Sequence, residues 1–300
     1  MTNDTITVLV GGSGVMGRGI AASFARAGVS AAILSRNPDA VDGIDPDVAV
    51  LDRLPEQPPE LIIESIPELL DLKLAFNARV EAAYDGACIL ASNTSSLPLQ
   101  DLADQLRHPR SYCGIHYFQP ADVMPVVEVA RVGQSDDRTI ERAVELLGRA
   151  GKYPIVLAEP IQGLLINRLQ HAILNEAYHL IERGICTAAD IDVAGKLLLG
   201  PRMSVTGLIE QKDLSGLDTH ALAQQELVPD LHHEGKASQV IVGKYTSNRL
   251  GTKTGTGFYD WRRMDVDGYR ANTSGLMTEV LELLDSSRPT VPPLAEDEDA

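Results

Sequence analysis

The sequence predicts an α/β protein in which a doubly wound sheet is followed by an all-helical C-terminal domain. The first observation is its opening order. A β-branched run at 6–10 meets a glycine turn, an apolar pattern of helical spacing follows at 15–27, and a second apolar run lies at 31–34. Strand, turn, helix and strand in this order form a βαβ unit. The second observation is a change near residue 160, after which no clear strand follows.

The remaining elements of the first domain alternate between strand-like runs and helical patterns, which favours a parallel sheet with crossover helices. We expect the helix at 67–84 to bury one stripe of apolar side chains, formed by Leu69, Leu72, Phe76 and Val80. The strand-like runs lie at 48–51, 61–63, 87–91, 112–118, 126–129 and 153–157, and the helical patterns at 67–84, 99–106 and 139–150.

The second domain opens with a long amphipathic helix at 164–182. Thr187 is expected to cap the next helix, with Asp190 at the capping-box position. A chain of 300 residues fits two domains better than one. We therefore expect a sheet domain at 1–160, a helical domain at 161–287 and an acidic, disordered tail at 288–300.

Composition excludes several classes of protein. The formal net charge of −16 argues against a nucleic-acid partner, which demands clustered Lys and Arg. No apolar run approaches the roughly 20 residues that span a bilayer, and the polar start, Met1–Thr5, does not resemble a signal peptide. The cysteines are widely spaced without a CxxC pattern, so we expect reduced thiols in a cytoplasmic protein and no metal site. They are Cys88, Cys113 and Cys186.

The glycine turn fits the pattern GxGxxG, with Gly12, Gly14 and Gly17 in the three glycine positions. The first allows a tight turn, the second allows the backbone to approach a pyrophosphate, and the third allows close packing of helix on strand. The helix that begins at Val15 and Met16 then presents free N–H groups to the phosphates. Because the motif follows a strand and opens a helix, it predicts a Rossmann-type dinucleotide site rather than a simple turn.

The residue after the second strand discriminates between nicotinamide cofactors. A carboxylate there binds the ribose 2′-hydroxyl of NAD, whereas a nearby arginine accommodates a 2′-phosphate. This chain has Ser35 and Arg36, with no carboxylate before Asp39. We therefore favour NADP(H) over NAD(H), the alternative being that Arg36 is an ordinary surface arginine.

His116 and Glu128 lie at or near the ends of consecutive strand-like runs, and a hairpin would bring them together. A carboxylate bonded to one ring nitrogen fixes the tautomer and leaves the other nitrogen free as a base. From spacing alone this pair is not specific, because a histidine beside a strand is usually a satisfied polar group.

Polar residues at 92–96 follow the strand-like run at 87–91. In a doubly wound sheet the carboxyl ends of the strands face the ligand crevice, so these residues are expected beside it. They either bind substrate or form the N-cap of the next helix. Asn167 lies among Leu and Ile residues at the domain boundary, either as a substrate contact or as an exposed polar residue.

Six segments together resemble the L-3-hydroxyacyl-CoA dehydrogenase family, in particular its 3-hydroxybutyryl-CoA dehydrogenase-like members. They occur in the family's order and span most of the chain. The segments are GSGVMGRGIA at 12–21, LIIESIPELLDLK at 61–73, SNTSSL at 92–97, GIHYFQPADVMPVVEV at 114–129, GLLINR at 163–168 and GTKTGTGFYDW at 251–261.

The resemblance implies an oxidoreductase that interconverts 3-hydroxyacyl and 3-ketoacyl groups of a small-molecule substrate. His116 would be the general base and Glu128 its orienting partner, while Ser95 would touch the reacting oxygen. Asn167 would complete the site from the helical domain. The residues implied beside the nicotinamide are Glu68, Lys73 and Asn93. The helical domain would bind substrate and form a homodimer.

Three departures from the family pattern bear on the substrate and cofactor. The family usually has an acidic residue where this chain has Ser35, and coenzyme A-using members have a helical excursion where this chain has a short segment rich in Asp and Pro at 36–59. The stretch 199–218 keeps only Gly216-Leu217-Asp218 cleanly. The same chemistry on a free hydroxy acid, a small polar alcohol or a carrier-protein-bound acyl group is the alternative. The non-enzymatic alternative is a nucleotide-binding structural protein.

Overall fold

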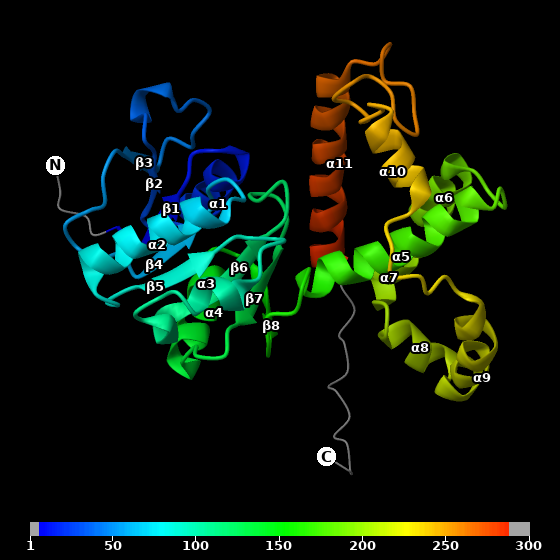
Figure 1. Ribbon diagram of the computed structural model, residues 1–300, viewed down its shortest axis with the longest axis horizontal. Helices are drawn as coiled ribbons and strands as arrows, with labels where there is room; N and C mark the ends of the chain where they lie inside the picture. Colours follow the sequence, from blue (N-terminus) through cyan, green and yellow to red (C-terminus); the bar gives the residue numbers. More distant parts are fainter. Residues whose placement is uncertain (1–5, 288–300) are drawn as a thin grey trace. The chain divides into compact units, whose positions relative to one another are not determined.

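The computed structural model describes residues 6–287 (Figure 1). By their contacts the residues divide into two compact units, Met1–Leu169 and Gln170–Ala300, which we call the sheet unit and the helical unit. The boundary expected near residue 160 falls before this division, because the first turn of the helix that starts at Leu164 is hydrogen-bonded to the sheet unit. The expected acidic tail at 288–300 and the segment Met1–Thr5 lie outside the described residues.

The described part of the sheet unit forms one sheet in the order β3-β2-β1-β4-β5-β6-β7-β8. All neighbouring strands are parallel except β6 and β7, which pair antiparallel. This confirms the predicted doubly wound sheet. The strands are β1 (Val8–Gly11), β2 (Ala31–Leu34), β3 (Val48–Leu51), β4 (Leu61–Glu64), β5 (Ile89–Ser92), β6 (Tyr112–Tyr117), β7 (Val126–Arg131) and β8 (Tyr153–Leu157).

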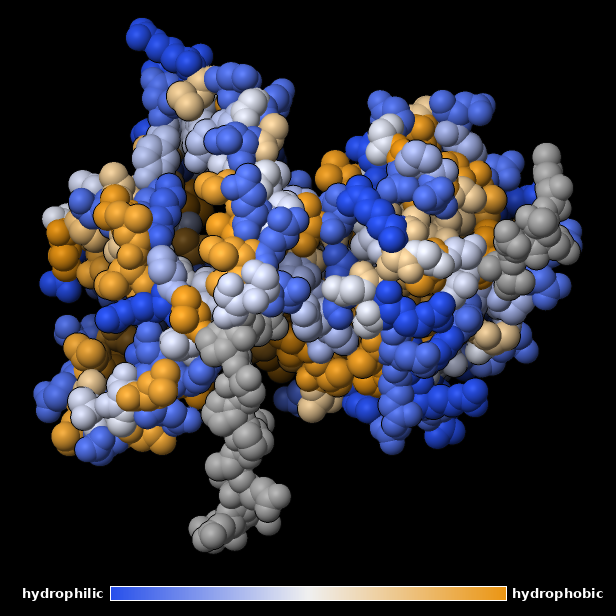
Figure 2. All heavy atoms as spheres, turned by 180° about the vertical axis from the view of Figure 1, so that it is seen from behind, coloured by the Kyte–Doolittle hydropathy of each residue, from blue (hydrophilic) through white to orange (hydrophobic). Residues whose placement is uncertain are grey.

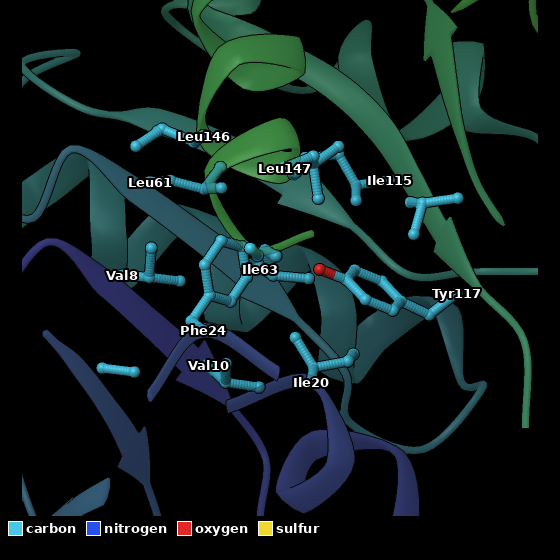
Figure 3. Packing of buried hydrophobic residues seen from close by; sticks show 14 of the residues in the cluster. Val8, Val10, Ile20, Phe24, Leu61, Ile63, Ile115, Tyr117, Leu146 and Leu147 are labelled. Carbon is cyan, nitrogen blue, oxygen red and sulfur yellow. The ribbon is translucent and has the colours of Figure 1, made fainter. Parts of the chain in front are cut away.

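Helices cover both faces of this sheet, and the alternation of side chains along the strands explains why. Val8 and Val10 point to the face covered by α1 (Val15–Arg26) and α4 (Asp137–Arg149), where Figure 3 shows Phe24, Ile20 and Leu147 packed against them and their neighbours. Leu9 points to the opposite face, which α2 (Leu70–Tyr84) and α3 (Leu99–Ala103) cover. Burying each large apolar side chain stabilises the fold by roughly 1.5–3 kcal/mol.

The expected apolar stripe of α2 is only partly buried, which corrects the prediction. Phe76 and Val80 are buried in the core, but Leu69 is 59% exposed and Leu72 is 43% exposed. The helix begins at Leu70 rather than near Pro67, because the backbone of Ile66 is held by the carboxylate of Glu64 and the chain bends there. Leu72 instead lines the cavity described below.

Between β2 and β4 the structure has a 3-10 turn at Pro38–Ala40 and strand β3, and no α-helix. The helical excursion expected of coenzyme A-using members is therefore missing from this described segment. No described helix is long and apolar enough to cross a membrane.

The helical unit leaves most of its apolar side chains exposed. Ala177 is its only described apolar side chain that is buried, and Figure 2 shows hydrophobic side chains reaching the surface. The predicted capping box of Thr187 and Asp190 is present at α6. From α5, which begins in the sheet unit, the helices are α5 (Leu164–Glu182), α6 (Ala188–Ala194), a π-helical turn (Gly195–Leu199), α7 (Gly200–Thr206), α8 (Glu210–Ser215), α9 (Leu217–Leu227), a 3-10 turn (Val228–Asp230), α10 (Gln239–Thr246) and α11 (Val266–Ser287).

Candidate active site

The glycine turn between β1 and α1 has space only for glycine at two of its positions. Gly12 has φ +130°, and a Cβ atom there would lie 2.5 Å from the carbonyl oxygen of Ser65. A Cβ atom on Gly17 would lie 1.9 Å from the carbonyl oxygen of Gly12, so the helix packs directly on the turn. Gly14 is the N-cap of α1 and has open space around it. This cradle and the free N–H groups of the helix fit a dinucleotide pyrophosphate.

A cavity of about 850 Å³ extends from this turn along the carboxyl ends of the central strands. Most of the predicted cofactor residues line it. They are Gly12, Gly14, Val15, Met16, Ser35, Arg36, Glu68 and Asn93, and Ser95 lies at the same cavity. Gly17 and Lys73 do not line it, because Gly17 lies beneath the turn and the Lys73 side chain is 1% exposed.

The cavity also has lining residues that sequence reasoning missed. Asp52 follows β3 just as Ser35 follows β2, and the two strands are paired so that the amide of Ser35 donates to the carbonyl of Leu51. Arg79 lies one helical turn beyond Phe76 in α2, with its guanidinium carbon 5.5 Å from the centre of the Phe76 ring. The spacing of Leu72, Phe76 and Arg79 places them on one face of the helix, but it does not say whether that face meets the core or a ligand cavity.

Ser35 and Arg36, at the position that discriminates between nicotinamide cofactors, both line the cavity. Ser35 is buried, and its hydroxyl is 3.2 Å from the hydroxyl of Ser13. Arg36 is exposed and forms no hydrogen bond or ion pair with any other described residue. Its guanidinium is therefore available to a ligand.

The expected contact between His116 and Glu128 is present. They are paired residues of the antiparallel strands β6 and β7, and Nδ1 of His116 is 2.7 Å from Oε2 of Glu128. Both side chains are buried, and Nδ1 donates its proton because an ionised carboxylate only accepts. No described residue bonds to Nε2, which leaves this nitrogen available as a base.

Glu128 has a second task that the sequence did not reveal. Its Oε1 atom accepts hydrogen bonds of 2.8 Å from the amides of Leu165 and Ile166, which are orphan N–H groups of the first turn of α5. A negative charge at a helix N-terminus is favourable. Asn167 follows directly in the same turn, so the residue expected from the helical domain belongs to the sheet unit instead.

Glu68 holds the polar loop that follows β5. Its Oε1 atom accepts hydrogen bonds from the hydroxyl of Thr94 and from the amides of Ser95 and Ser96, both at 3.1 Å. Burial opposes ionisation of Glu68, but the hydrogen bond from Thr94 and the charge of Lys73 outweigh it and lower its pKa to about 2. The hydroxyl of Ser95 forms no hydrogen bond with other described residues, which leaves it available to a ligand.

Asn93 and Gln162 hold the same loop from its two sides. The Oδ1 atom of Asn93 accepts a bond of 2.8 Å from the amide of Tyr117 in β6, and Nε2 of Gln162 donates to the carbonyl of Ser96 at 2.8 Å. The loop therefore lies between the cofactor cavity and the strand that carries His116. The described residues contain no group of three or more side chains suited to hold a metal ion.

The sheet carries a glycine cradle at a helix N-terminus and a buried histidine–carboxylate pair. Together these two features are typical of a Rossmann-type nicotinamide-dependent oxidoreductase. A cradle of this kind is suited to a dinucleotide, and a buried histidine paired with a carboxylate is suited to act as the base that alcohol oxidation requires.

Comparison with known protein families gives the same class. The 3-hydroxyacyl-CoA dehydrogenase NAD binding domain matches residues 56–160, and the C-terminal domain of the same family matches residues 163–261. A probable 3-hydroxyacyl-CoA dehydrogenase of Caenorhabditis elegans is 30% identical over 299 residues, covering 86% of this chain and 93% of the relative. The chain belongs to the 3-hydroxyacyl-CoA dehydrogenase family.

Another relative is named for a different substrate. The 5-formyl-3-hydroxy-2-methylpyridine 4-carboxylate 5-dehydrogenase of Mesorhizobium japonicum is 24% identical over 298 residues, covering 91% of this chain and 96% of the relative. A crystal structure of an enzyme of that activity, described as an NAD+ dependent dismutase, has a TM-score of 0.88 at 23% identity, covering 95% of this chain and 100% of the other, and shares the fold. The chain matches only 29% of the Vibrio campbellii fatty acid oxidation complex subunit alpha.

Proposed function

We propose that this oxidoreductase interconverts a 3-hydroxy and a 3-keto group with His116 as the general base. The single observation that supports this role most strongly is the buried bond between His116 and Glu128, which leaves Nε2 free. A nicotinamide cofactor bound in the cradle would supply or accept the hydride. Gly12, Gly14 and the first turn of α1 would hold its pyrophosphate, and Gly17 lets that helix pack against the turn.

The proton is handled by residues of this chain. In the oxidative direction Nε2 of His116 takes the proton of the substrate hydroxyl, and Glu128 stabilises the resulting imidazolium through Nδ1. In the reductive direction the imidazolium returns that proton to the oxygen. We propose that the free hydroxyl of Ser95 binds the reacting oxygen of the substrate and that the side-chain amide of Asn167 binds the group next to it. The loop of Ser95 is hydrogen-bonded to β6 through Asn93, next to His116. The helix turn that carries Asn167 is hydrogen-bonded to Glu128.

We also propose that the chain is a cytoplasmic homodimer assembled through the helical unit. The support is the exposure of its apolar side chains, because a helical domain needs a buried apolar stripe to be stable. Fully covering one leucine contributes about 1.5–3 kcal/mol, so many of these side chains must be covered to offset the roughly 4–15 kcal/mol that association costs. The free cysteines fit a reducing compartment.

We propose that the substrate does not depend on coenzyme A for binding to the sheet unit. The segment between β2 and β4 carries two arginines, Arg36 and Arg53, and seven carboxylates. Three of the carboxylates, Asp42, Asp45 and Glu60, form ion pairs with Arg18, Arg26 and Arg142 of other elements. The other four, Asp39, Asp47, Asp52 and Glu56, still outnumber the two arginines. Such a surface repels the phosphates of a coenzyme, although salt screens exposed charges beyond about 8–10 Å. The pyridine carboxylate in the name of the Mesorhizobium japonicum relative supports a free acid as the alternative substrate.

The test compares kcat/KM for acetoacetyl-CoA with that for an acetoacetyl thioester of a minimal thiol, with free 3-keto acids as a further arm. We expect the two thioesters to differ by less than about tenfold, since remote binding energy accelerates a reaction only where the protein makes those contacts. A preference of roughly a hundredfold for the coenzyme A form, about 2.7 kcal/mol, would contradict the proposal. Turnover of the free 3-keto acids, without turnover of either thioester, would favour a free acid as the substrate.

We further propose that the enzyme binds NADP(H) in preference to NAD(H), supported by the unpaired Arg36 beside Ser35. Arg36→Ala should weaken NADPH binding about tenfold or more and change NADH binding little, because charge-assisted bonds to a phosphate are lost only for NADPH. Asp52→Asn is the matched variant, and it should strengthen NADPH binding by removing a like charge from the same cavity. Fluorescence titration with both cofactors measures these effects.

Two results would contradict the preference for NADP(H). Equal losses for both cofactors in Arg36→Ala would mean that the arginine does not bind the 2′-phosphate. A large loss of NADH binding in Asp52→Asn would mean that Asp52 binds the ribose hydroxyls of NAD. Asp52 would then replace the carboxylate that this chain lacks after β2.

A further inference from the structure

A buried ion pair lies at the carboxyl ends of β4 and β5, and no step of the proposed mechanism uses it. Glu64 is fully buried, Lys73 is 1% exposed, and Nζ of Lys73 is 2.6 Å from Oε1 of Glu64. Removing two charges from water costs several kcal/mol per ion unless hydrogen bonds satisfy them. The hydrogen bonds around this pair, next to the candidate active site, must therefore offset that cost.

Glu64 is hydrogen-bonded to both of the segments that end at the site. Its Oε1 atom accepts a bond of 2.9 Å from the amide of Ile66, at the bend before α2. Its Oε2 atom accepts a bond of 2.8 Å from the hydroxyl of Ser92, the last residue of β5. One carboxylate thus fixes the start of the segment that carries Glu68 and the start of the loop that carries Ser95.

Lys73 connects this buried carboxylate to a more exposed one. Its ammonium group is 3.2 Å from Oε2 of Glu68, while Oε1 of Glu68 holds the amides of Ser95 and Ser96. The contacts therefore run from Glu64 through Lys73 to Glu68 and on to the loop. If Glu64 were neutral, the Lys73 ammonium would have Glu68 as its only carboxylate partner among the described residues, and Glu68 would be drawn from the loop amides.

We infer that Glu64 is a positioning residue, which acts through Lys73 and Glu68 to place the hydroxyl of Ser95 against the reacting oxygen. The inference rests on the proposed role of Ser95. Because a misplacement of about 1 Å at a reacting centre can lower a rate roughly a hundredfold, a residue without any contact to substrate can govern kcat. The alternative is that the ion pair only stabilises the fold.

The experiment is a double-mutant cycle of Glu64→Gln and Ser95→Ala, measured as kcat with saturating cofactor. We expect Glu64→Gln alone to lower kcat roughly 10- to 100-fold, and the cofactor is held at saturation because Glu68 also lines the cofactor cavity. In the Ser95→Ala background the same change should lower kcat by less than about threefold, because coupled residues are not additive.

Glu81→Gln is the matched control. Glu81 is a buried carboxylate near the other end of α2, where its Oε1 atom accepts a bond of 2.8 Å from the amide of His108. We expect this variant to lower Tm while its kcat stays within about twofold of the native value, which separates loss of stability from loss of positioning. If Glu64→Gln does not fold, Ser92→Ala removes one of the three side-chain bonds of Glu64, together with the bond of 3.3 Å that the Ser92 hydroxyl accepts from the amide of Thr94. Its smaller effect on kcat should likewise vanish in the Ser95→Ala background.

The outcomes that overturn the inference are distinct. A fall in kcat by the same factor with and without Ser95 would mean that Glu64 acts elsewhere, and an unchanged kcat with a lower Tm would leave a purely structural ion pair. If Ser95→Ala alone leaves kcat unchanged, the proposed role of Ser95 fails, and the inference fails with it. The first two results leave the proposed function intact.

Discussion

His116→Ala is expected to lower kcat by roughly 10²–10⁴-fold, the usual contribution of a positioned general base. Cofactor binding should change little, because His116 does not line the cofactor cavity. The variant leaves Oε2 of Glu128 without its partner but keeps the two bonds of Oε1 to the amides of α5, so the first turn of that helix should stay in place. Steady-state kinetics at saturating substrate and a cofactor titration measure the two effects separately.

Glu128→Gln is the companion variant. An amide has one oxygen and one NH₂ group, so it cannot accept from both His116 and the amides of α5 as the carboxylate does. We expect Glu128→Gln to lower kcat less than His116→Ala does. We also expect a lower Tm, because the NH₂ group of the glutamine then faces another donor, either Nδ1–H of His116 or the N–H groups of α5.

For His116→Ala, a kcat above about a tenth of the native value would mean that the base is another residue.

Much of the sheet unit could be predicted from local patterns. The strands at 31–34, 48–51 and 153–157 have the expected bounds, because short apolar runs between Gly, Pro and Asp residues have few other ways to bury themselves. The contact of His116 with Glu128 followed from a hairpin, since antiparallel neighbours face each other.

The contacts that local patterns could not reveal join segments far apart in the sequence. The bonds from Glu128 to the start of α5 and from Glu68 to the loop at 94–96 depend on how the strands are ordered. Glu64 comes directly after the strand predicted at 61–63, and only the register of β4 with β5 places Ser92 beside it. A period of 3.6 residues likewise does not say whether Leu72 faces the core or a ligand cavity.

Gly17→Ala and Gly14→Ala should both weaken cofactor binding, but only the first should destabilise the fold. A Cβ atom at position 17 would lie 1.9 Å from the carbonyl oxygen of Gly12, so α1 or the turn must move. Such overpacking costs roughly 1–3 kcal/mol and should lower Tm. The displaced turn should raise the Kd of the cofactor by about 10- to 100-fold, since each 1.4 kcal/mol is a factor of ten.

Position 14 provides the contrast. A Cβ atom there meets no atom of the protein within 4 Å, and Gly14 has φ −70°, which any residue adopts. Gly14→Ala should therefore fold with a native Tm, yet its methyl group would stand where the backbone must approach the pyrophosphate. Thermal unfolding and cofactor titration of both variants separate the two effects. If Gly14→Ala binds the cofactor as tightly as the native chain, the pyrophosphate does not lie on this turn, and the glycines serve only the packing of α1 on β1.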